Sequence, residues 1–499
     1  MKCGLRPIRC VILAVSLTGC TAHVASPRVV VDAAPLSVAS CRDRYRDLDA
    51  WVEIAAVGDG KSARIAGYPY LRIDRFLAAD EVKPDAGNDG FEAWTARLRD
   101  LDRQAREFEL QNLPDDFKGK LGEASGTWID VCADILMNSD LKSSAARTQL
   151  LALARVADDY SISKRVIGLY PFTSLPFIAG VRNLHEGMQE EFSRPLESLS
   201  VEGRLIRYQP VPEHSPMSTE SVRVLLEDAG RKPQGIPDLS LVDQQRLFER
   251  FAPVYEIDVV DDDDRIGMPE LADDGKPSVN VGRPVVFRRV SYTRFEGRTL
   301  LQLNYSVWFP SRPSDGDFDY MSGHRDGITF RVTLGSDGRP LIYDSMHNCG
   351  CYHLFIPTLR LQAKPPPDGH EEPPLIPQRI GQEDARVVLR IAHRTHYLQR
   401  IYFDAPVKGG GNAGDGYAMR DDDSLRSLPM MDGNRRSLFQ PDGLVHGTER
   451  GERWFFWPMG IAEPGAMRQW GRHATLFIGK RHFDDPHLIE RYFLPVGGG

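Results

Sequence analysis

The sequence predicts an α+β protein, in which a helical domain at residues 41–200 precedes a mainly antiparallel, β-rich domain at 201–499. The spacing of the apolar residues predicts this division. They recur every three or four positions in the first part of the chain and every second position after about residue 200. The 499 residues, 41% hydrophobic and 26% charged, suffice for two or three packed domains. The formal net charge of -8 argues against a nucleic-acid partner.

Several segments of the first part have helical spacing. Apolar side chains fall every three or four residues over 41–55 and 91–108, and those of 128–136 share one face of a third segment. Pro114 ends the helical pattern after the second segment, because proline cannot continue a helix. Residues 183–200 predict one more helix.

Residues 166–181 form the most apolar stretch after the N-terminal segment. Pro171 and Pro176 interrupt it, and it is too short to cross a bilayer, which needs about 20 residues. The pattern favours a buried, irregular connection between helices. The alternative is a surface that contacts lipid or a partner.

Alternating apolar and polar residues predict strands in the second part. Residues 301–309 and 328–334 alternate in this way, and the turn Gly-Ser-Asp-Gly at 335–338 leads into 341–343. This arrangement predicts a β-hairpin. Further short strands, the last two of them buried, are predicted at 387–391, 397–403, 454–457 and 475–479.

The densest group of chemically active side chains is the segment His347–His353, with the sequence HNCGCYH, directly after a predicted strand. Every second residue is a potential metal ligand, and in an extended strand the four would share one face, about 6.6 Å apart. Ligands so spaced reach one ion only if the chain bends, which Gly350 permits. After such a bend the candidate ligands for Zn or Cu are His347, Cys349, Cys351 and His353 or a subset of them, with His324 or the pair His393 and His396 completing the shell.

The same bend permits other chemistry. Cys349 and Cys351 can form a strained local disulfide or an exchanging thiol pair, and the nearby histidines then serve only as hydrogen-bonding groups. The sequence leaves these alternatives open. His324 and Asp326, at the entry of a predicted strand, can act as base and orienting group of a hydrolytic site, although glycine-flanked polar residues are more typical of turns. The run Asp261–Asp264 lacks calcium-loop spacing and favours a solvated acidic turn.

The N-terminus carries the pattern of an export signal. Three basic residues precede a short apolar run, and the run ends in small residues and a cysteine, as the positions Lys2, Arg6, Arg9, Val11–Leu17 and Leu17-Thr18-Gly19-Cys20 show. The apolar run is too short for a membrane-spanning helix. The pattern resembles the lipobox of a bacterial lipoprotein signal peptide.

That resemblance implies a processed and lipidated chain. Signal peptidase II would remove residues 1–19, and Cys20 would carry diacylglycerol and an acyl chain such as palmitate. Residues 20–40 would then be a tether between the lipid and the folded body. Thr21 follows the anchor where a retention signal for the inner membrane would have aspartate, so the outer membrane, facing the periplasm, is the expected location.

Four cysteines remain after the anchor, in a compartment that oxidises thiols. Cys41 and Cys132 both lie on inward faces of predicted helices, and we expect them to form a disulfide. The alternative is two buried thiols, because cysteine is among the most frequently buried residues.

Together these patterns predict a membrane-anchored, periplasm-facing lipoprotein with a binding or structural role. It would present the HNCGCYH segment to a small ligand, an ion or another envelope protein. The rival hypothesis is a metal-dependent envelope hydrolase. In that case Asp326 would activate or orient water, and Zn would be bound by some of His324, His347, His353 and His393.

Overall fold

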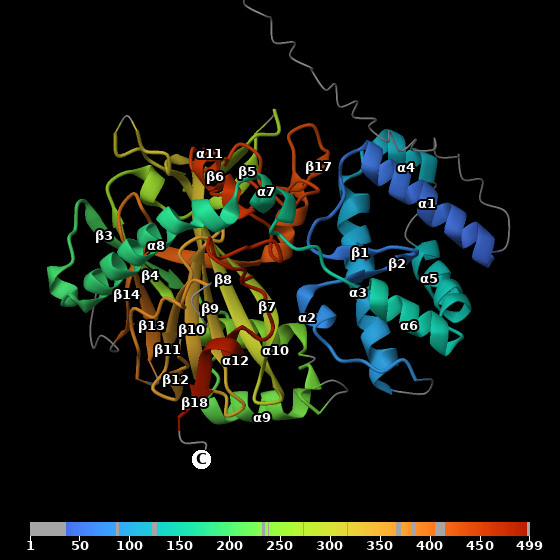
Figure 1. The fold of residues 1–499 in the computed structure, drawn as a ribbon, viewed down its shortest axis with the longest axis horizontal. Coiled ribbons are helices and arrows are strands. Elements are labelled where there is room, and N and C mark those ends of the chain that lie inside the picture. Colours follow the sequence, from blue (N-terminus) through green and yellow to red (C-terminus); the bar gives the residue numbers. More distant parts are fainter. Residues whose placement is uncertain are drawn as a thin grey trace, which may run out of the picture.

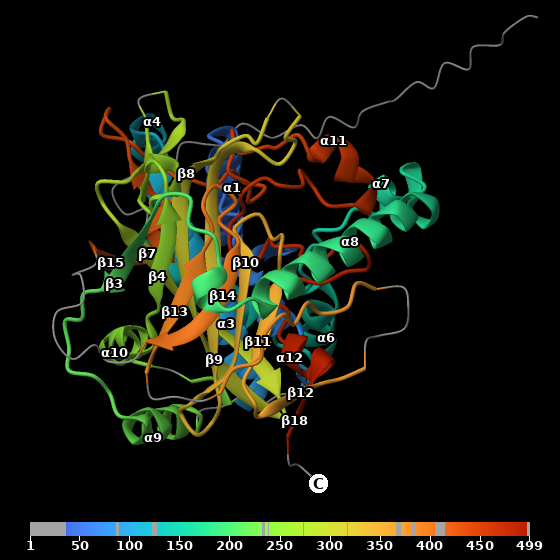
Figure 2. The ribbon, with the colours of Figure 1, turned by 90° about the vertical axis from the view of Figure 1, so that its left-hand side faces the viewer.

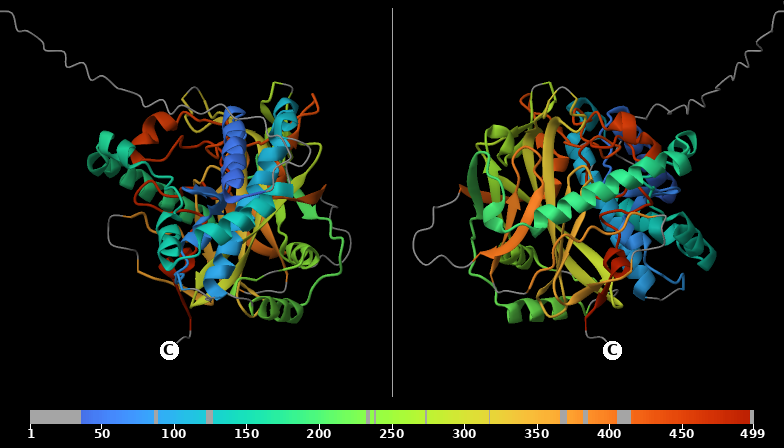
Figure 3. Two further views of the ribbon diagram at one scale, coloured as in Figure 1. Left: turned by 90° about the vertical axis from the view of Figure 1, so that its right-hand side faces the viewer. Right: turned by 60° about the vertical axis from the view of Figure 1, so that its left-hand side comes forward.

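The computed structural model describes residues 36–496, except 86–88, 122–126, 232–234, 238, 273, 317, 366–370, 382–384 and 405–414. The predicted signal peptide, Cys20 and most of the predicted tether lie outside the described residues. The fold of this part is α+β, as predicted: a helical part stands beside a large mixed sheet (Figure 1). Views from other sides show the helical part lying against one side of the β-rich part (Figure 3).

The helical part surrounds a small hairpin that the sequence analysis did not predict. Its helices are α1 (Val38–Ile54), α2 (Arg75–Ala78), α3 (Asp89–Asn112), α4 (Asp115–Leu121), α5 (Thr127–Asp140) and α6 (Ser144–Leu153), and its strands are β1 (Ala63–Ile65) and β2 (Tyr68–Ile73). The predicted helices at 41–55, 91–108 and 128–136 correspond to α1, α3 and α5.

Capping and packing explain why α1 forms where it does. Ser37 accepts a hydrogen bond from the backbone N–H of Ser40, whose side chain in turn accepts from the Ser37 N–H, which is a capping box. The apolar stripe of α1 packs against α5 and β2 in a core that includes Tyr45 and Trp128. Within this core the sulfur atoms of Cys41 and Cys132 lie at bonding distance, 2.04 Å.

The β-rich part is built on a sheet of ten described strands. Their order is β11 (Leu354–Pro357), β10 (Pro340–His347), β9 (Gly323–Leu334), β8 (Arg298–Arg312), β7 (Val285–Phe295), β15 (Asp415–Asp421), β3 (Arg204–Pro210), β4 (Val254–Val259), β13 (Arg386–Ile391) and β14 (Leu398–Asp404). Most neighbours are antiparallel, as predicted, but β15 runs parallel to β7 and β3, and β13 runs parallel to β4.

The predicted hairpin is the one formed by β9 and β10. Its turn ends at Gly338, whose positive φ of 76° suits glycine, and the two strands pair antiparallel from Leu334 and Pro340 to Ile328 and His347. This hairpin positions the His347–His353 segment, because β10 ends at His347 and β11 begins at Leu354.

Helices cover the sheet. α8 (Tyr170–Ser193) runs obliquely across the β-rich part, and α9 (Thr219–Ala229) and α10 (Leu241–Phe251) lie at one end of it (Figure 2). Met188 and Phe192 of α8 belong to the core of the sheet. α8 therefore packs with the β-rich part, although the sequence placed residues up to 200 in the helical domain.

The remaining elements are short. They are α7 (Ile162–Ile167), α11 (Arg453–Phe456), α12 (Leu488–Tyr492) and the strand pairs β5–β6 (Met268–Leu271, Pro277–Asn280), β12–β18 (Leu361–Ala363, Phe493–Pro495) and β16–β17 (Leu428–Pro429, Arg435–Arg436). The 3-10 turn Trp457–Met459 comes directly after α11.

Three local expectations are wrong. Residues 166–181 are not an irregular buried connection: they belong to α7 and α8, and many of their apolar side chains are exposed. Pro171 is tolerated in the first turn of α8, where no intrahelical bond to its nitrogen is needed, and Pro176 lies within the helix. Residues 454–457 form the exposed helix α11 and its end instead of a buried strand, and 475–479 are irregular.

Candidate functional site

The HNCGCYH segment forms a tight turn between β10 and β11. The His347 N–H donates to the Cys351 carbonyl at 2.9 Å, and the Gly350 N–H donates to the His347 carbonyl at 2.7 Å. Gly350 has a φ of 94°, and a Cβ there would lie 2.5 Å from the Ala474 carbonyl oxygen. The bend that the sequence predicts at Gly350 is therefore present, and only glycine fits it.

Cys349 and Cys351 are unbridged thiols in contact with each other. Their mutual hydrogen bond lowers the pKa of the Cys349 thiol and, together with burial, raises the pKa of the Cys351 thiol well above its usual value. The Arg468 side chain donates to the Cys349 carbonyl at 3.0 Å, which fixes the turn. The pair is thus asymmetric, and Cys349 ionises first.

His347 belongs to a line of alternating imidazoles and carboxylates that is buried except at His393. Its Nδ1 lies 3.4 Å from Asp326, whose other oxygen lies 2.9 Å from Nδ1 of His396. The opposite nitrogen of His396 lies 3.6 Å from Asp264, which also lies 2.8 Å from Nδ1 of His393. We call these five residues the His/Asp network.

The network is held together by charge. Burial opposes ionisation of Asp326, but the guanidinium of Arg450, at 3.1 Å, and the neighbouring imidazoles outweigh it and keep the pKa of that carboxyl well below its usual value. Burial lowers the pKa of His396, but its two carboxylate partners raise it above the usual value overall. The imidazole of His396 also stacks on the ring of Phe309 at 3.9 Å.

His353 points to a different carboxylate. Its Nε2 lies 3.1 Å from Asp344, which also forms a buried ion pair with Arg331. Burial lowers the pKa of His353 to about 3, so the imidazole is neutral at pH 7. The charge of Asp344 is therefore balanced by Arg331, and His353 contributes only a hydrogen bond.

The predicted Zn or Cu ligands do not converge. His347 and His353 face the separate carboxylates Asp326 and Asp344, while Cys349 and Cys351 face each other. Among the residues that the structure describes, no group of three or more such side chains is arranged to hold a metal ion.

The proposed hydrolytic pair is also separated. Asp326 is fully buried in the network, whereas His324 is exposed at the start of β9. Asp264 departs from expectation as well. It is buried and accepts hydrogen bonds from the backbone N–H groups of Val260 and Arg394, so that end of the acidic run is not a solvated turn.

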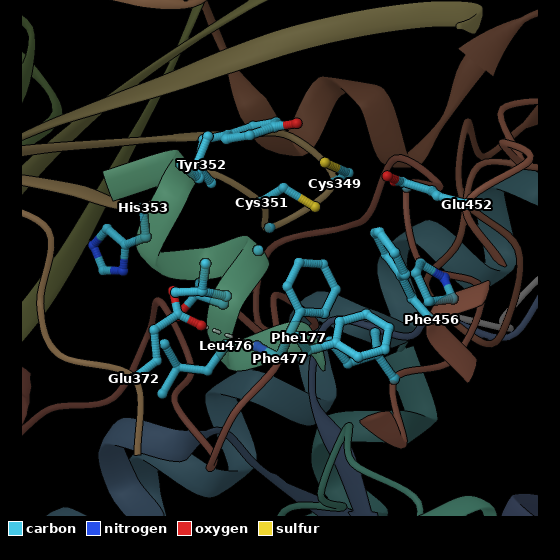
Figure 4. Close-up of a pocket in the computed structure, with 18 of the residues that line it drawn as sticks. Phe177, Cys349, Cys351, Tyr352, His353, Glu372, Glu452, Phe456, Leu476 and Phe477 are labelled. Carbon is cyan, nitrogen blue, oxygen red and sulfur yellow. Dashed lines mark hydrogen bonds between the residues drawn. The ribbon is translucent and has the colours of Figure 1, made fainter. Parts of the chain in front are cut away.

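A cavity of about 440 Å³ opens beside the thiol pair (Figure 4). Its wall is mainly apolar and comes from α8, from the His347–His353 turn, from the segment around α11 and from residues 474–477. The rings of Phe177, Phe456 and Phe477 pack together on one side of it, with centroids 4.8–6.2 Å apart. Such a volume and lining are typical of a small-molecule site.

The polar groups in the lining of this cavity include the carboxyls of Glu372 and Glu452. Burial raises the pKa of the Glu452 carboxyl despite the opposing effect of Arg450, so this side chain holds its proton more readily than an exposed glutamate. Glu372 lies 3.6 Å from Nε2 of His185 on α8. The cavity thus combines an apolar body with a small number of hydrogen-bonding positions at its edges.

Two tyrosines connect the cavity to the His/Asp network. Tyr352 and Tyr397 line the cavity, and the centroids of their rings lie 5.1 and 5.6 Å from that of His347. Their own rings are 4.5 Å apart, and the Tyr352 hydroxyl donates to the Met321 sulfur at 3.2 Å. Tyr352 lies within the HNCGCYH segment, but the sequence analysis gave it no role, and it missed Tyr397, Glu452 and Arg450, because nothing in the local pattern marks residues that only the fold brings together.

No protein-family model matches this chain, and neither the curated proteins nor the solved structures contain a match. Within the described residues, no helix combines the length and the apolar character needed to cross a membrane. The indications of function are therefore the geometry of the site and the N-terminal sequence pattern.

Proposed function

We propose that this protein is a lipid-anchored component of the bacterial cell envelope that binds an apolar or amphipathic small molecule in the cavity beside Cys349 and Cys351. The observation that carries the proposal is the cavity itself, about 440 Å³ with a mainly apolar wall. Lipobox-like residues at 17–20 support the anchor, and Thr21 supports a location on the outer membrane facing the periplasm.

The lining favours a ligand with a long apolar body and one hydrogen-bonding end. Aromatic rings on one side of the cavity provide a large contact area. Glu452 and Glu372 offer hydrogen-bonding oxygens at its edges. The unbridged thiols lie in the same wall, so oxidation to a disulfide would change the shape of the site without changing its apolar character.

Filling the cavity from α8 tests the binding site. Gly180 lines the cavity and has open space around the position of a Cβ, so Gly180→Trp should occlude the site without straining the helix. The probe is 1-N-phenylnaphthylamine, an uncharged dye that becomes fluorescent in apolar surroundings. We expect the substitution to raise the dye's Kd about tenfold or more, which corresponds to about 1.4 kcal/mol.

Gly187→Trp is the matched control. Gly187 lies on the same helix, two turns further along the same face, also has open space at its Cβ, and does not line the cavity. The control should bind the dye as the unsubstituted protein does. Equal weakening in both variants, or in neither, would contradict the cavity as the binding site.

Lipidation is tested at the anchor. Growth with radiolabelled palmitate should label the unsubstituted protein, and Cys20→Ser should abolish both the label and the removal of residues 1–19, because the serine hydroxyl cannot replace the thiol that carries the diacylglycerol. Label and processed mass are read by autoradiography and mass spectrometry. An unlabelled parent protein, or a Cys20→Ser protein that is still labelled, would refute the anchor.

A further inference from the structure

The helix α7, the start of α8 and α11 lie next to one another (Figure 2), and several of their apolar side chains are exposed. Phe172 is 72% exposed and Trp454 is 69% exposed, and their neighbours are similarly open to solvent. The members of this α7–α8–α11 surface are Ile162, Val166, Ile167, Leu169, Phe172, Leu175, Trp454 and Phe455. Soluble proteins rarely leave so many large apolar side chains together without a partner.

The surface is rigidly supported. The Ser161 N–H donates to the Gly460 carbonyl at 2.8 Å, and the Arg165 side chain donates to the Met459 carbonyl at 2.8 Å, so α7 is fixed to the segment just after α11. Phe177 of α8 packs against Phe456 of α11, with ring centroids 5.1 Å apart. The exposure therefore belongs to packed helices and not to a loose segment.

The charges and the aromatic residues favour a bilayer as the occupant. Residues 162–185 contain Lys164, Arg165 and Arg182 but no acidic residue before Glu186, and on α11 the charge of Arg453 is balanced by Glu463 at 3.7 Å, although the whole chain carries a formal net charge of -8. Basic residues beside tryptophan, phenylalanine and aliphatic side chains are typical of helices that lie in the interface of an anionic membrane.

We propose that the α7–α8–α11 surface inserts into the interfacial region of an anionic lipid bilayer and holds the folded body against the membrane. The proposal uses the lipid anchor proposed above. About 16 residues separate Cys20 from Leu36, and an extended chain of that length spans at most about 55 Å, which bounds how far Leu36 can lie from the lipid anchor.

This orientation also places the cavity close to the membrane. Pro176 and Phe177, which come directly after the exposed part of α8, line the cavity, and so does Phe456, which comes after Trp454 and Phe455. An apolar molecule leaving the bilayer at this surface would therefore meet the cavity wall next.

Tryptophan quenching tests the contact independently of the anchor. The full-length lipidated protein is reconstituted in vesicles of phosphatidylethanolamine and phosphatidylglycerol, with or without brominated acyl chains, which quench nearby indoles. Trp454 and Trp457 are exposed, at 69% and 36%, whereas Trp51, Trp94, Trp128 and Trp308 are at most 8% exposed. We expect brominated lipid to quench the emission of the unsubstituted protein, and Ile167→Ser/Phe172→Ser to remove about half or more of that quenching.

Leu241→Ser/Val242→Ser on α10 is the matched control, because it removes two apolar side chains that are also largely exposed, at 81% and 59%. It should leave the quenching unchanged, and all three proteins should still sediment with vesicles through their anchors.

No quenching by brominated lipid, or equal quenching in the α7–α8 variant, would overturn the proposal. The proposal would also be overturned if the protein formed a dimer in detergent that only Ile167→Ser/Phe172→Ser dissociates, and if brominated lipid did not quench its emission in vesicles. Dye binding to the cavity is measured separately, so the two proposals can fail independently.

Discussion

Replacing Asp326 with asparagine should lower the free energy of unfolding by about 3–5 kcal/mol, because it leaves a buried cation without its countercharge. Asp326 is fully buried, and it contacts Arg450 at 3.1 Å and His396 at 2.9 Å. The Arg450 side chain is 2% exposed and cannot turn to water. Asparagine keeps the shape of the side chain, so the loss would come from the charge, and urea unfolding at pH 5.5 measures it.

The effect should depend on pH in a defined direction. The folded pKa of Asp326 is depressed, so its contribution is present above its unfolded value of about 3.9 and is lost as pH falls further. The folded pKa of His396 is raised, so its contribution is present below about 6.5 and is lost as pH rises through the higher folded value. The difference between the parent and Asp326→Asn should therefore be largest between about pH 4 and 6.5.

The control for this substitution is Asp228→Asn. Asp228 at the end of α9 forms an exposed ion pair with Arg231, three residues further on, and such pairs contribute about 0.5 kcal/mol or less. A loss at Asp326 no larger than at Asp228 would show that the His/Asp network does not hold the β-rich part together. If Asp326→Asn lowered the free energy of unfolding by the same large amount at pH 3 and at pH 5.5, the ionised carboxylate of Asp326 would not be the source of the stabilisation.

The regular elements were predictable because their signals are local. The spacing around Cys41 and Trp94 follows the helix period, and the residues from Ile328 to Leu334 follow the strand period, so α1, α3 and β9 could be located from the sequence. The bend at Gly350 was predictable for the same reason, since only a glycine allows that backbone conformation at low cost.

The errors have a common physical origin. The sequence of residues 166–181 shows that the side chains are apolar, but it does not show whether they are buried in the protein or exposed on its surface. A helix with exposed apolar side chains was therefore interpreted as buried. The same holds for Trp454 in α11. Proline reinforced the error, because Pro171 stops a helix in most positions yet is accepted in a first turn.

The site itself could be predicted only in part. The cysteines and histidines of the HNCGCYH segment were recognisable, and so were His393 and His396, but the carboxylates of the network were not assignable to them: Asp264 is 129 residues from His393, and Asp326 is 70 residues from His396. Sheet pairing determines which carboxylate each imidazole meets, and the spacing of residues within one segment carries no information about it. The expected convergence of four ligands was therefore replaced by two separate His–Asp contacts.

Removing the disulfide of the helical part, with Cys41→Ala/Cys132→Ala, should lower the free energy of unfolding of that part by about 4–5 kcal/mol. The bond closes a loop of about 91 residues, and cross-linking a loop of that length restricts the unfolded chain by about this amount. Both cysteines are fully buried in the core around Tyr45 and Trp128, so the helices they join would lose the one disulfide cross-link among the described residues. Urea unfolding followed by circular dichroism at 222 nm measures the change.

A reductant separates the cross-link from the cavity that smaller side chains leave. Dithiothreitol should destabilise the parent protein, which then loses the bond but keeps both sulfur atoms, and should leave the double variant unchanged. Any effect on the variant would come from Cys349 and Cys351, which both proteins retain, so the variant serves as the control for that pair. If the parent unfolds at the same urea concentration with and without reductant, the bond contributes nothing, and the core around Leu48 and Leu136 alone holds α1 to α5.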